Sequence, residues 1–300
     1  MSATRTGTAS VLIGGLLMAV NAGVGALDTV IVRLASTEVH AFEIAFFRNA
    51  FSLLVLLPFL LVRSNLSLRT PYWPVHALRA VLKLAALIAF FLAVTQLPLA
   101  VATAIAFTTP VFAAIGSMLF LGEPVRIGRI AGVMAGLCGV LIILRPGAIA
   151  FDTGIVLALL AAIGLAGVAL LMKLSSGREP ADRIVWFNLV LTVPIALIVC
   201  LPVWTTPSPF VLGILALQGA LGALAQFSFA RALSMADASV LMPVDFIRLP
   251  LAALFGQFLF AEQPDALVFV GGAVIFASAI VLLHQERRPA IVLPTAEGKS

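Results

Sequence analysis

The most constraining feature of this sequence is a series of ten long apolar stretches, separated by short polar connections, that fill almost the whole chain of 300 residues. The stretches are residues 11–34, 40–62, 74–96, 99–121, 126–144, 153–173, 184–202, 210–233, 238–260 and 266–284. A helix of about 20 apolar residues crosses a bilayer core. Backbone N–H and C=O groups in lipid must form their hydrogen bonds within the protein, as they do in a helix. The strands of a membrane barrel would instead appear as shorter segments in which apolar and polar residues alternate. We therefore expect an all-α integral membrane protein with ten transmembrane helices.

The basic residues are distributed unequally between the two sides of this ten-span arrangement. Of the 18 Lys and Arg residues, only Arg33 and Arg145 fall on one side. On the other side lie Arg5, Arg63, Arg69, Arg126, Arg129, Lys173, Arg178, Arg183, Arg287, Arg288 and Lys299. An excess of positive charge marks the cytoplasmic side, so we expect a bacterial inner-membrane protein with both termini in the cytoplasm. This placement explains the net charge of +5 without a nucleic-acid partner, and we expect none.

The two halves of the chain resemble each other when one is shifted by 139 residues. Residues 76–100 then fall on residues 215–239 without a gap, and Glu123 falls on Glu262. Each half holds five spans, an odd number, so the second copy enters the membrane in the opposite orientation. We expect two inverted five-helix repeats, at 11–146 and 153–286, followed by a cytoplasmic tail at 287–300. Such repeats are typical of transporters whose substrate site lies near the midplane, between the halves.

The ninth span carries two residues of opposite charge, Asp245 and Arg248, between Pro243 and Pro250. A charge at membrane depth is costly unless it meets protein, water or a partner. A spacing of three places both side chains on one helix face, close enough to pair. Two interpretations are open at this point. The residues form a self-neutralising structural pair, or they form a gate or substrate contact whose pairing changes during transport.

Polar residues also interrupt the first, second and eighth spans. Asn21 and Asp28 lie seven residues apart, on one stripe of the first helix, and Arg48 lies well inside the second. Asp28 is a candidate proton or cation site, or else a structural partner of Arg33 or of a basic residue on a neighbouring span. Arg48 is a candidate substrate contact or a structural counter-ion. Gln226 is the polar candidate in the eighth span.

Motifs that indicate catalysis or a cofactor are absent from the sequence. There is no G-x-x-x-x-G-K-[ST] loop for ATP and no H-E-x-x-H pair for zinc. Cys138 and Cys200 both lie in apolar spans, where cysteine behaves as a small hydrophobe. We therefore expect no enzymatic activity, no metal site and no cofactor.

Several segments together resemble a known family of membrane proteins. They are HAFEIAFFRNAF at 40–51, the segment 78–124 that begins LRAVLK and ends LFLGEP, GVLIILRPG at 139–147, and ARALSMADASVLMPVDFIRLPLAALFGQFLFAEQP at 230–264. The chain resembles the drug/metabolite transporter superfamily and, within it, the ten-helix EamA-type proteins. Its 230–264 segment is similar to branches that include riboflavin and S-adenosylmethionine transporters. The resemblance implies a central cavity faced by Asp28, Thr108, Thr109, Gln226, Asp245, Phe246 and Arg248.

The predicted function is secondary transport of a small organic metabolite across the inner membrane by alternating access. The candidate substrates are S-adenosylmethionine, riboflavin, amino acids and drug-like compounds. Coupling to protons, through Asp28 or Asp245, is a hypothesis, and the oligomeric state is left open. The alternatives are a membrane assembly protein that transports nothing, an intramembrane enzyme and a passive channel.

Overall fold

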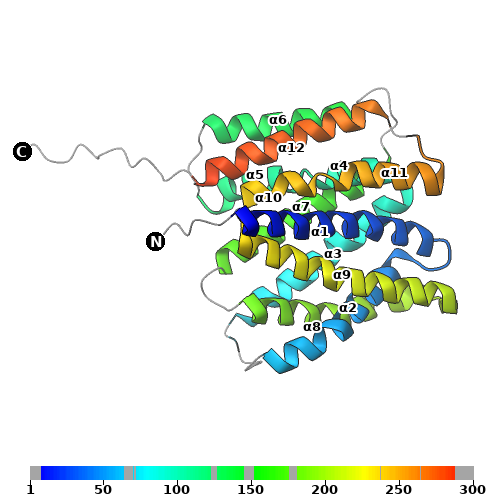
Figure 1. Ribbon diagram of the computed structural model, residues 1–300. Helices are drawn as coiled ribbons and strands as arrows, with labels where there is room; N and C mark the ends of the chain where they lie inside the picture. Colours follow the sequence, from blue (N-terminus) through cyan, green and yellow to red (C-terminus); the bar gives the residue numbers. More distant parts are fainter. Residues whose placement is uncertain are drawn as a thin grey trace, which may run out of the picture.

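The computed structural model describes residues 8–63, 70, 72–122, 127–144, 152–175, 181–236, 238–263 and 265–287. Within these ranges the secondary structure is helical, without a β-strand (Figure 1). The helices are α1 (Thr8–Ala35), α2 (Ala41–Arg63), α3 (Trp73–Gln96), α4 (Leu99–Ala106), α5 (Thr109–Phe120), α6 (Ile127–Leu144), α7 (Thr153–Ser175), α8 (Ala181–Cys200), the 3₁₀ helix η1 (Leu201–Val203), α9 (Pro209–Met235), α10 (Ala238–Asp245), α11 (Arg248–Phe260) and α12 (Ala266–Arg287).

The helices of the described segments account for the predicted crossings. Nine of them are long and apolar enough to span a bilayer, when α4 is counted with α5 and α10 with α11. Phe187–Val203, from α8 into η1, is a tenth and shorter apolar segment. The start of α1 and the end of α12 lie at the same end of the bundle (Figure 1), as an even number of crossings requires. The prediction of an all-α membrane protein is confirmed.

The helix boundaries repeat along the chain with the spacing found in the sequence. Helix α4 begins at Leu99 and α10 begins at Ala238, which is 139 residues later. The beginnings of α6 and α12, at Ile127 and Ala266, differ by the same number. Packing repeats as well, because α3 lies against α7 and its counterpart α9 lies against α1. Glu123 and the predicted tail beyond Arg287 lie outside the described residues.

The fourth and ninth spans are each divided into two shorter helices at equivalent positions. Turns at residues 107–108 and 246–247 separate α4 from α5 and α10 from α11. Each turn is followed by a proline, Pro110 or Pro250, which has no N–H to continue the helical hydrogen bonds. The two turns face each other, since the ring centroids of Phe107 and Phe246 are 5.6 Å apart. Both spans therefore bend where the two halves meet.

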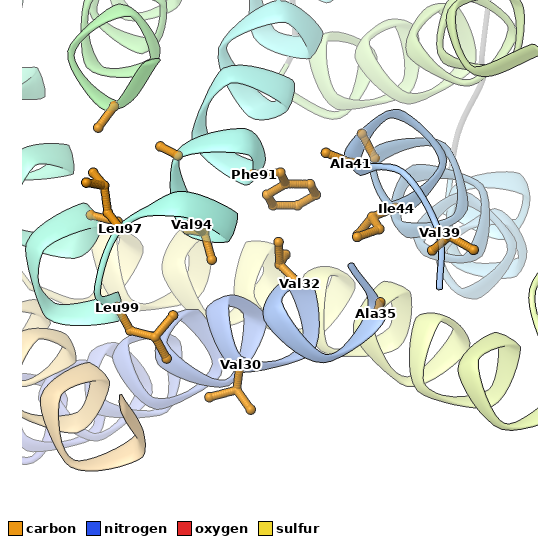
Figure 2. Packing of buried hydrophobic residues seen from close by; sticks show 14 of the residues in the cluster. Val30, Val32, Ala35, Val39, Ala41, Ile44, Phe91, Val94, Leu97 and Leu99 are labelled. Carbon is orange, nitrogen blue, oxygen red and sulfur yellow. The ribbon is translucent and has the colours of Figure 1, made fainter. Parts of the chain in front are cut away.

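A compact apolar cluster holds α1, α2 and α3 together at the end of the bundle opposite the start of α1. Its centre is Phe91 of α3, which is fully buried beside Val32 of α1 and Ile44 of α2 (Figure 2). In lipid, helices associate through close packing and not through exclusion of water. The cluster therefore stabilises this end by dispersion contacts, which depend on the fit of each side chain.

Packing of α6 against α12 depends on glycine. A Cβ atom on Gly139 would lie 2.7 Å from the carbonyl oxygen of Gly271 and 2.7 Å from Cγ1 of Ile275. Gly132 and Gly136, the small residues of α6 with four-residue spacing, face the side chains of Leu282 and Ser278 on α12 in the same way. The backbones of these helices can therefore approach each other only because the side chains are missing.

Candidate functional site

A cavity of about 430 Å³ lies between the two halves of the chain. The lining residues come from α1, α2, α3, α4, α5, α7, α9, α10, α11 and α12, and they include the turn residue Phe107. Its walls are largely apolar and aromatic, with Phe90, Phe107, Phe229 and Phe276 among them. The ionised groups in this wall form two separate clusters.

The first cluster is centred on Asp28 of α1. Oδ1 of Asp28 accepts a hydrogen bond from Nε of Arg48 at 3.1 Å and another from Nε2 of Gln218 at 3.0 Å. The side chains of Asp28 and Arg48 are mostly buried, and Gln218 is completely buried. Of the two structural partners expected for Asp28, a basic residue on a neighbouring span is confirmed as Arg48, and Arg33 is wrong. Arg48 is closer to Asp28 because it lies at the same depth on α2, whereas Arg33 lies beyond it near the end of α1.

The second cluster lies at the turn in the ninth span. Oδ1 of Asp245, at the end of α10, accepts from Nη2 of Arg248 at 3.0 Å and from Nδ2 of Asn21 at 3.1 Å. The ion pair therefore bridges the two short helices, as the spacing of three predicted. Arg248 lies directly against α1, because a Cβ atom on Gly25 would be only 2.5 Å from its Nε.

Both clusters have the same construction. In each, one carboxylate oxygen accepts from a guanidinium group and from a side-chain amide. Helix α1 joins them, since Asn21, Gly25 and Asp28 follow one another by four and three residues along one stripe. The spacing of seven residues places the clusters about 10 Å apart along α1.

Six of the nine predicted site residues line the cavity. They are Asn21, Asp28, Arg48, Thr109, Asp245 and Arg248. Thr108 is buried instead, and its hydroxyl donates to the carbonyl oxygen of Ile105 at 2.6 Å. Phe246 packs between the rings of Phe107 and Phe276. Gln226 is half-buried on α9 and is not among the residues that line the cavity.

Three of the unpredicted residues matter most to the site. Gln218 completes the Asp28 cluster, Gly25 accommodates Arg248, and Thr103 lines the cavity. The hydroxyl oxygen of Thr103 is buried and has no hydrogen-bond partner among the described residues. The signal for Gln218 was its polar side chain inside an apolar span, the same signal that selected Gln226.

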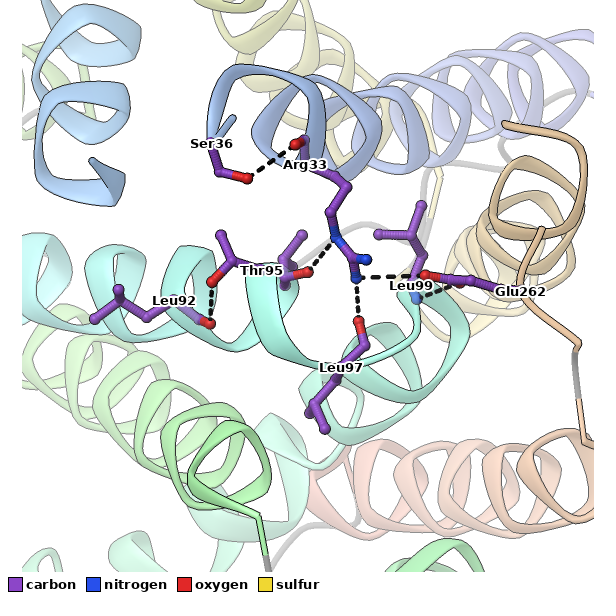
Figure 3. Close-up of polar contacts among 8 residues, drawn as sticks. Arg33, Ser36, Leu92, Thr95, Leu97, Leu99 and Glu262 are labelled. Carbon is purple, nitrogen blue, oxygen red and sulfur yellow. Dashed lines mark hydrogen bonds and ion pairs between the residues drawn. The ribbon is translucent and has the colours of Figure 1, made fainter. Parts of the chain in front are cut away.

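At the end of the bundle where α1 ends lies a polar contact that we call the latch, formed by Arg33, Val94, Leu97, Leu99 and Glu262 (Figure 3). Arg33 pairs with Glu262, with 3.3 Å between Nη2 and Oε1. Arg33 also donates to the carbonyl oxygens of Val94, at 2.8 Å, and Leu97. Oε2 of Glu262 accepts from the backbone N–H of Leu99, at the start of α4, at 2.8 Å. The latch therefore ties the ends of α1, α3 and α11 to α4.

Beneath the latch, α4 packs against α11 through a buried apolar cluster that includes Ala100, Ala104, Leu249 and Ala253. The equivalent helices at the other end, α5 and α10, share no comparable packing within the described residues. The cavity reaches that end along Met242 of α10 and side chains of α12. The described helix packing therefore closes the bundle at the latch end, and α5 and α10 form no equivalent closure at the end where α1 begins.

Comparisons with known proteins agree with this architecture. The sequence profile of the EamA-like transporter family matches the chain twice, at residues 12–145 and 152–284. An S-adenosylmethionine uptake transporter of Rickettsia felis is 30% identical over 261 residues, which cover 87% of this chain and 89% of the relative. A riboflavin transporter of Vibrio cholerae is 31% identical over 280 residues, covering 92% of each chain.

Two further similarities extend over nearly the full length. The pseudopaline exporter CntI of Pseudomonas aeruginosa is 29% identical over 277 residues, covering 91% of this chain and 97% of the relative. A crystal structure with 20% sequence identity superposes with a TM-score of 0.59 and covers 94% of this chain and 99% of the other, which supports the fold alone. The family predicted from the sequence segments is confirmed, and with it the prediction of a transporter and not an enzyme.

Proposed function

Because the chain belongs to the EamA-like transporter family, we propose that it is a secondary carrier that moves a small organic metabolite across the bacterial inner membrane by alternating access. The observation that carries the proposal is the cavity between the two halves, lined by two ion-pair clusters, in a bundle whose described helices pack together at the latch end and not at the other. Charged groups around a cavity at membrane depth are typical of substrate and ion pathways, which supports transport.

The two halves, 11–146 and 153–286, act in this proposal as the units that exchange conformations. The excess of basic residues supports a topology with both termini in the cytoplasm, and in that topology the latch lies on the outer side. The present structure then corresponds to a state open to the cytoplasm, with α4 and α11 in contact. In the opposite state, the latch opens and α5 closes on α10.

The proposal also concerns the substrate, the direction of transport and the coupling ion. The relatives include proteins named for uptake and one named for export, so direction is not implied by similarity. Their names make S-adenosylmethionine and riboflavin the first substrates to test, before amino acids and drug-like compounds. Coupling to protons through Asp28 or Asp245 stays a prediction, which a counterflow assay with and without a pH gradient tests.

The test of the proposed function is counterflow in proteoliposomes. Vesicles loaded with unlabelled S-adenosylmethionine or riboflavin are diluted into a trace of the labelled compound. A carrier gives a transient, saturable accumulation of label, whereas a channel gives flux without saturation and an assembly protein gives none. Chemical change of the compound would indicate an enzyme. Absence of counterflow for every metabolite of these classes would contradict the proposal.

A further inference from the structure

We propose that the cavity recognises its solute through an amino-acid-type head group, in which a carboxylate and an ammonium group lie close together. This inference rests on the proposed transport function, because the solute concerned is the one carried. The cluster that takes the head group is Asn21, Asp245 and Arg248, at the turn in the ninth span.

The charges around the cavity are balanced. Among the residues that the structure describes, the charged side chains in its lining are Asp28, Asp245, Arg48 and Arg248, two of each sign. Lys83 of α3 is not among the lining residues. A solute group with a single charge would leave one of these charges without a counter-charge, at a depth where that is costly. A head group that carries both signs leaves the balance unchanged, as an uncharged solute does, but only the head group can also pair with both members of an ion pair.

Atoms of both signs remain available for such a head group. All described hydrogen bonds to Asp28 and Asp245 are made to Oδ1, so Oδ2 of each accepts none within the described residues. Toward other described residues, Arg48 donates through Nε alone and Arg248 through Nη2 alone. Guanidinium N–H groups bind a carboxylate strongly, and a carboxylate oxygen accepts from an ammonium group.

Two observations favour the Asp245 cluster over the Asp28 cluster for this role. The Arg248 side chain is 29% exposed, against 18% for Arg48, so it is the more accessible guanidinium. The Asp245 cluster also lies nearer the open end, while Asp28 lies farther along α1 toward the latch. A solute that enters from the open end therefore meets Asp245 and Arg248 first.

The remainder of the solute would lie against the aromatic wall. Phe107, Phe229 and Phe276 line the cavity and offer apolar ring surfaces. Thr103 is 2% exposed, lines the same cavity, and its hydroxyl has no partner among the described residues. A buried hydroxyl of this kind is satisfied by a polar atom of a ligand or by water. These groups fit an amino acid with a ring-bearing side chain that itself carries a polar atom.

Gly25 is a positioning residue for this recognition. An added Cβ would lie 2.5 Å from Nε and 2.6 Å from Cζ of Arg248, so alanine at this position must displace the guanidinium group. The change removes no charge and no hydrogen-bonding atom. Gly23 offers a matched control on the same helix, because an added Cβ there meets nothing within 4 Å.

The experiment compares binding of four probes to the purified full-length chain in detergent by calorimetry. S-adenosylmethionine and S-adenosylhomocysteine carry the head group, 5′-methylthioadenosine has the same nucleoside without it, and riboflavin has a different ring and no head group. We expect S-adenosylhomocysteine to bind at least tenfold more tightly than 5′-methylthioadenosine. We expect Gly25→Ala to reduce the affinity for S-adenosylhomocysteine at least tenfold, and Gly23→Ala to change it less than twofold.

Equal affinities for S-adenosylhomocysteine and 5′-methylthioadenosine, or no binding by either probe that carries the head group, would overturn the inference. Preference for riboflavin would overturn it as well. These results need only the unsubstituted protein, so a failure of Gly25→Ala to fold leaves the test intact. Counterflow of riboflavin without head-group dependence would refute the inference while the transport function stands. Head-group-dependent binding without any counterflow would refute the transport function instead.

Discussion

Neutralising Glu262 should open the latch end of the cavity. In Glu262→Gln the ion pair with Arg33 is lost, and the charge-assisted hydrogen bond to the backbone N–H of Leu99 becomes a neutral one. Both latch side chains are partly exposed, at 22% and 13%, so the ion pair is worth little more than a surface pair, about 0.2–1 kcal/mol. The weakened hydrogen bond adds about 1 kcal/mol.

The sum, about 1–2 kcal/mol, applies only to the state in which the latch is closed. It therefore shifts the equilibrium toward the state with an open latch by about 5- to 30-fold, because about 1.4 kcal/mol corresponds to a factor of ten. A cysteine behind the latch reports this shift. Ala100 is 3% exposed and lies in the apolar seal between α4 and α11, so it reacts only when that seal opens.

The assay measures the labelling rate of Ala100→Cys by a membrane-impermeant thiol reagent, in a chain whose Cys138 and Cys200 are replaced by alanine. Glu262→Gln should raise the rate by about the factor of 5 to 30 derived from the latch contacts. Glu38→Gln is the control, since Glu38 bonds Ser208 at the same end and takes no part in the latch. An unchanged rate in Glu262→Gln, or an equal increase in Glu38→Gln, would refute the reasoning.

Three other substitutions test the site and the packing. Asp245→Asn should abolish counterflow, because it leaves Arg248 without its counter-charge, while elution as a single folded species is retained; normal counterflow would exclude a mechanistic role. Gly139→Leu should destabilise the protein by about 1–3 kcal/mol through overpacking against α12, which would lower the melting temperature in detergent. Gly213→Leu is the control and should leave the melting temperature unchanged, because a Cβ added at Gly213 meets no atom within 4 Å. Phe91→Ala should lower the free energy of unfolding by about 3–5 kcal/mol, because it leaves a cavity in the core. Phe258→Ala should lower it far less, because Phe258 is 78% exposed. Similar melting temperatures of the two variants would contradict the packing in Figure 2.

The crossings and the repeat were predictable because they depend on patterns along the chain. Apolar length fixes a transmembrane helix wherever the bilayer is the solvent. The shift of 139 residues, read from weak similarity, recurs in the helix boundaries, such as those at Leu99 and Ala238. The division of the fourth and ninth spans was not predicted, although Pro250 and Pro110 were visible. Proline can be accommodated inside a transmembrane helix when neighbours satisfy the freed backbone groups, as Pro194 is in α8.

The partners of the site residues were harder to predict because they depend on how each helix is rotated. Thr108 and Thr109 are adjacent, so they point about 100° apart when helical. Only Thr109 lines the cavity, and the turn between α4 and α5 decides which one does. Gln218 donates to Asp28 across 190 positions in the sequence, a distance at which no helical periodicity carries information.

The contact between Phe107 and Phe246 has a consequence for the way this carrier would move. The two rings occupy equivalent places in the two halves and touch each other. The contact would therefore persist when the two halves exchange conformations. In the proposed mechanism it is a pivot that both end states share. A change at this pivot acts on both states alike and alters the speed of their interconversion, whereas a change between Arg33 and Glu262 alters which state is populated.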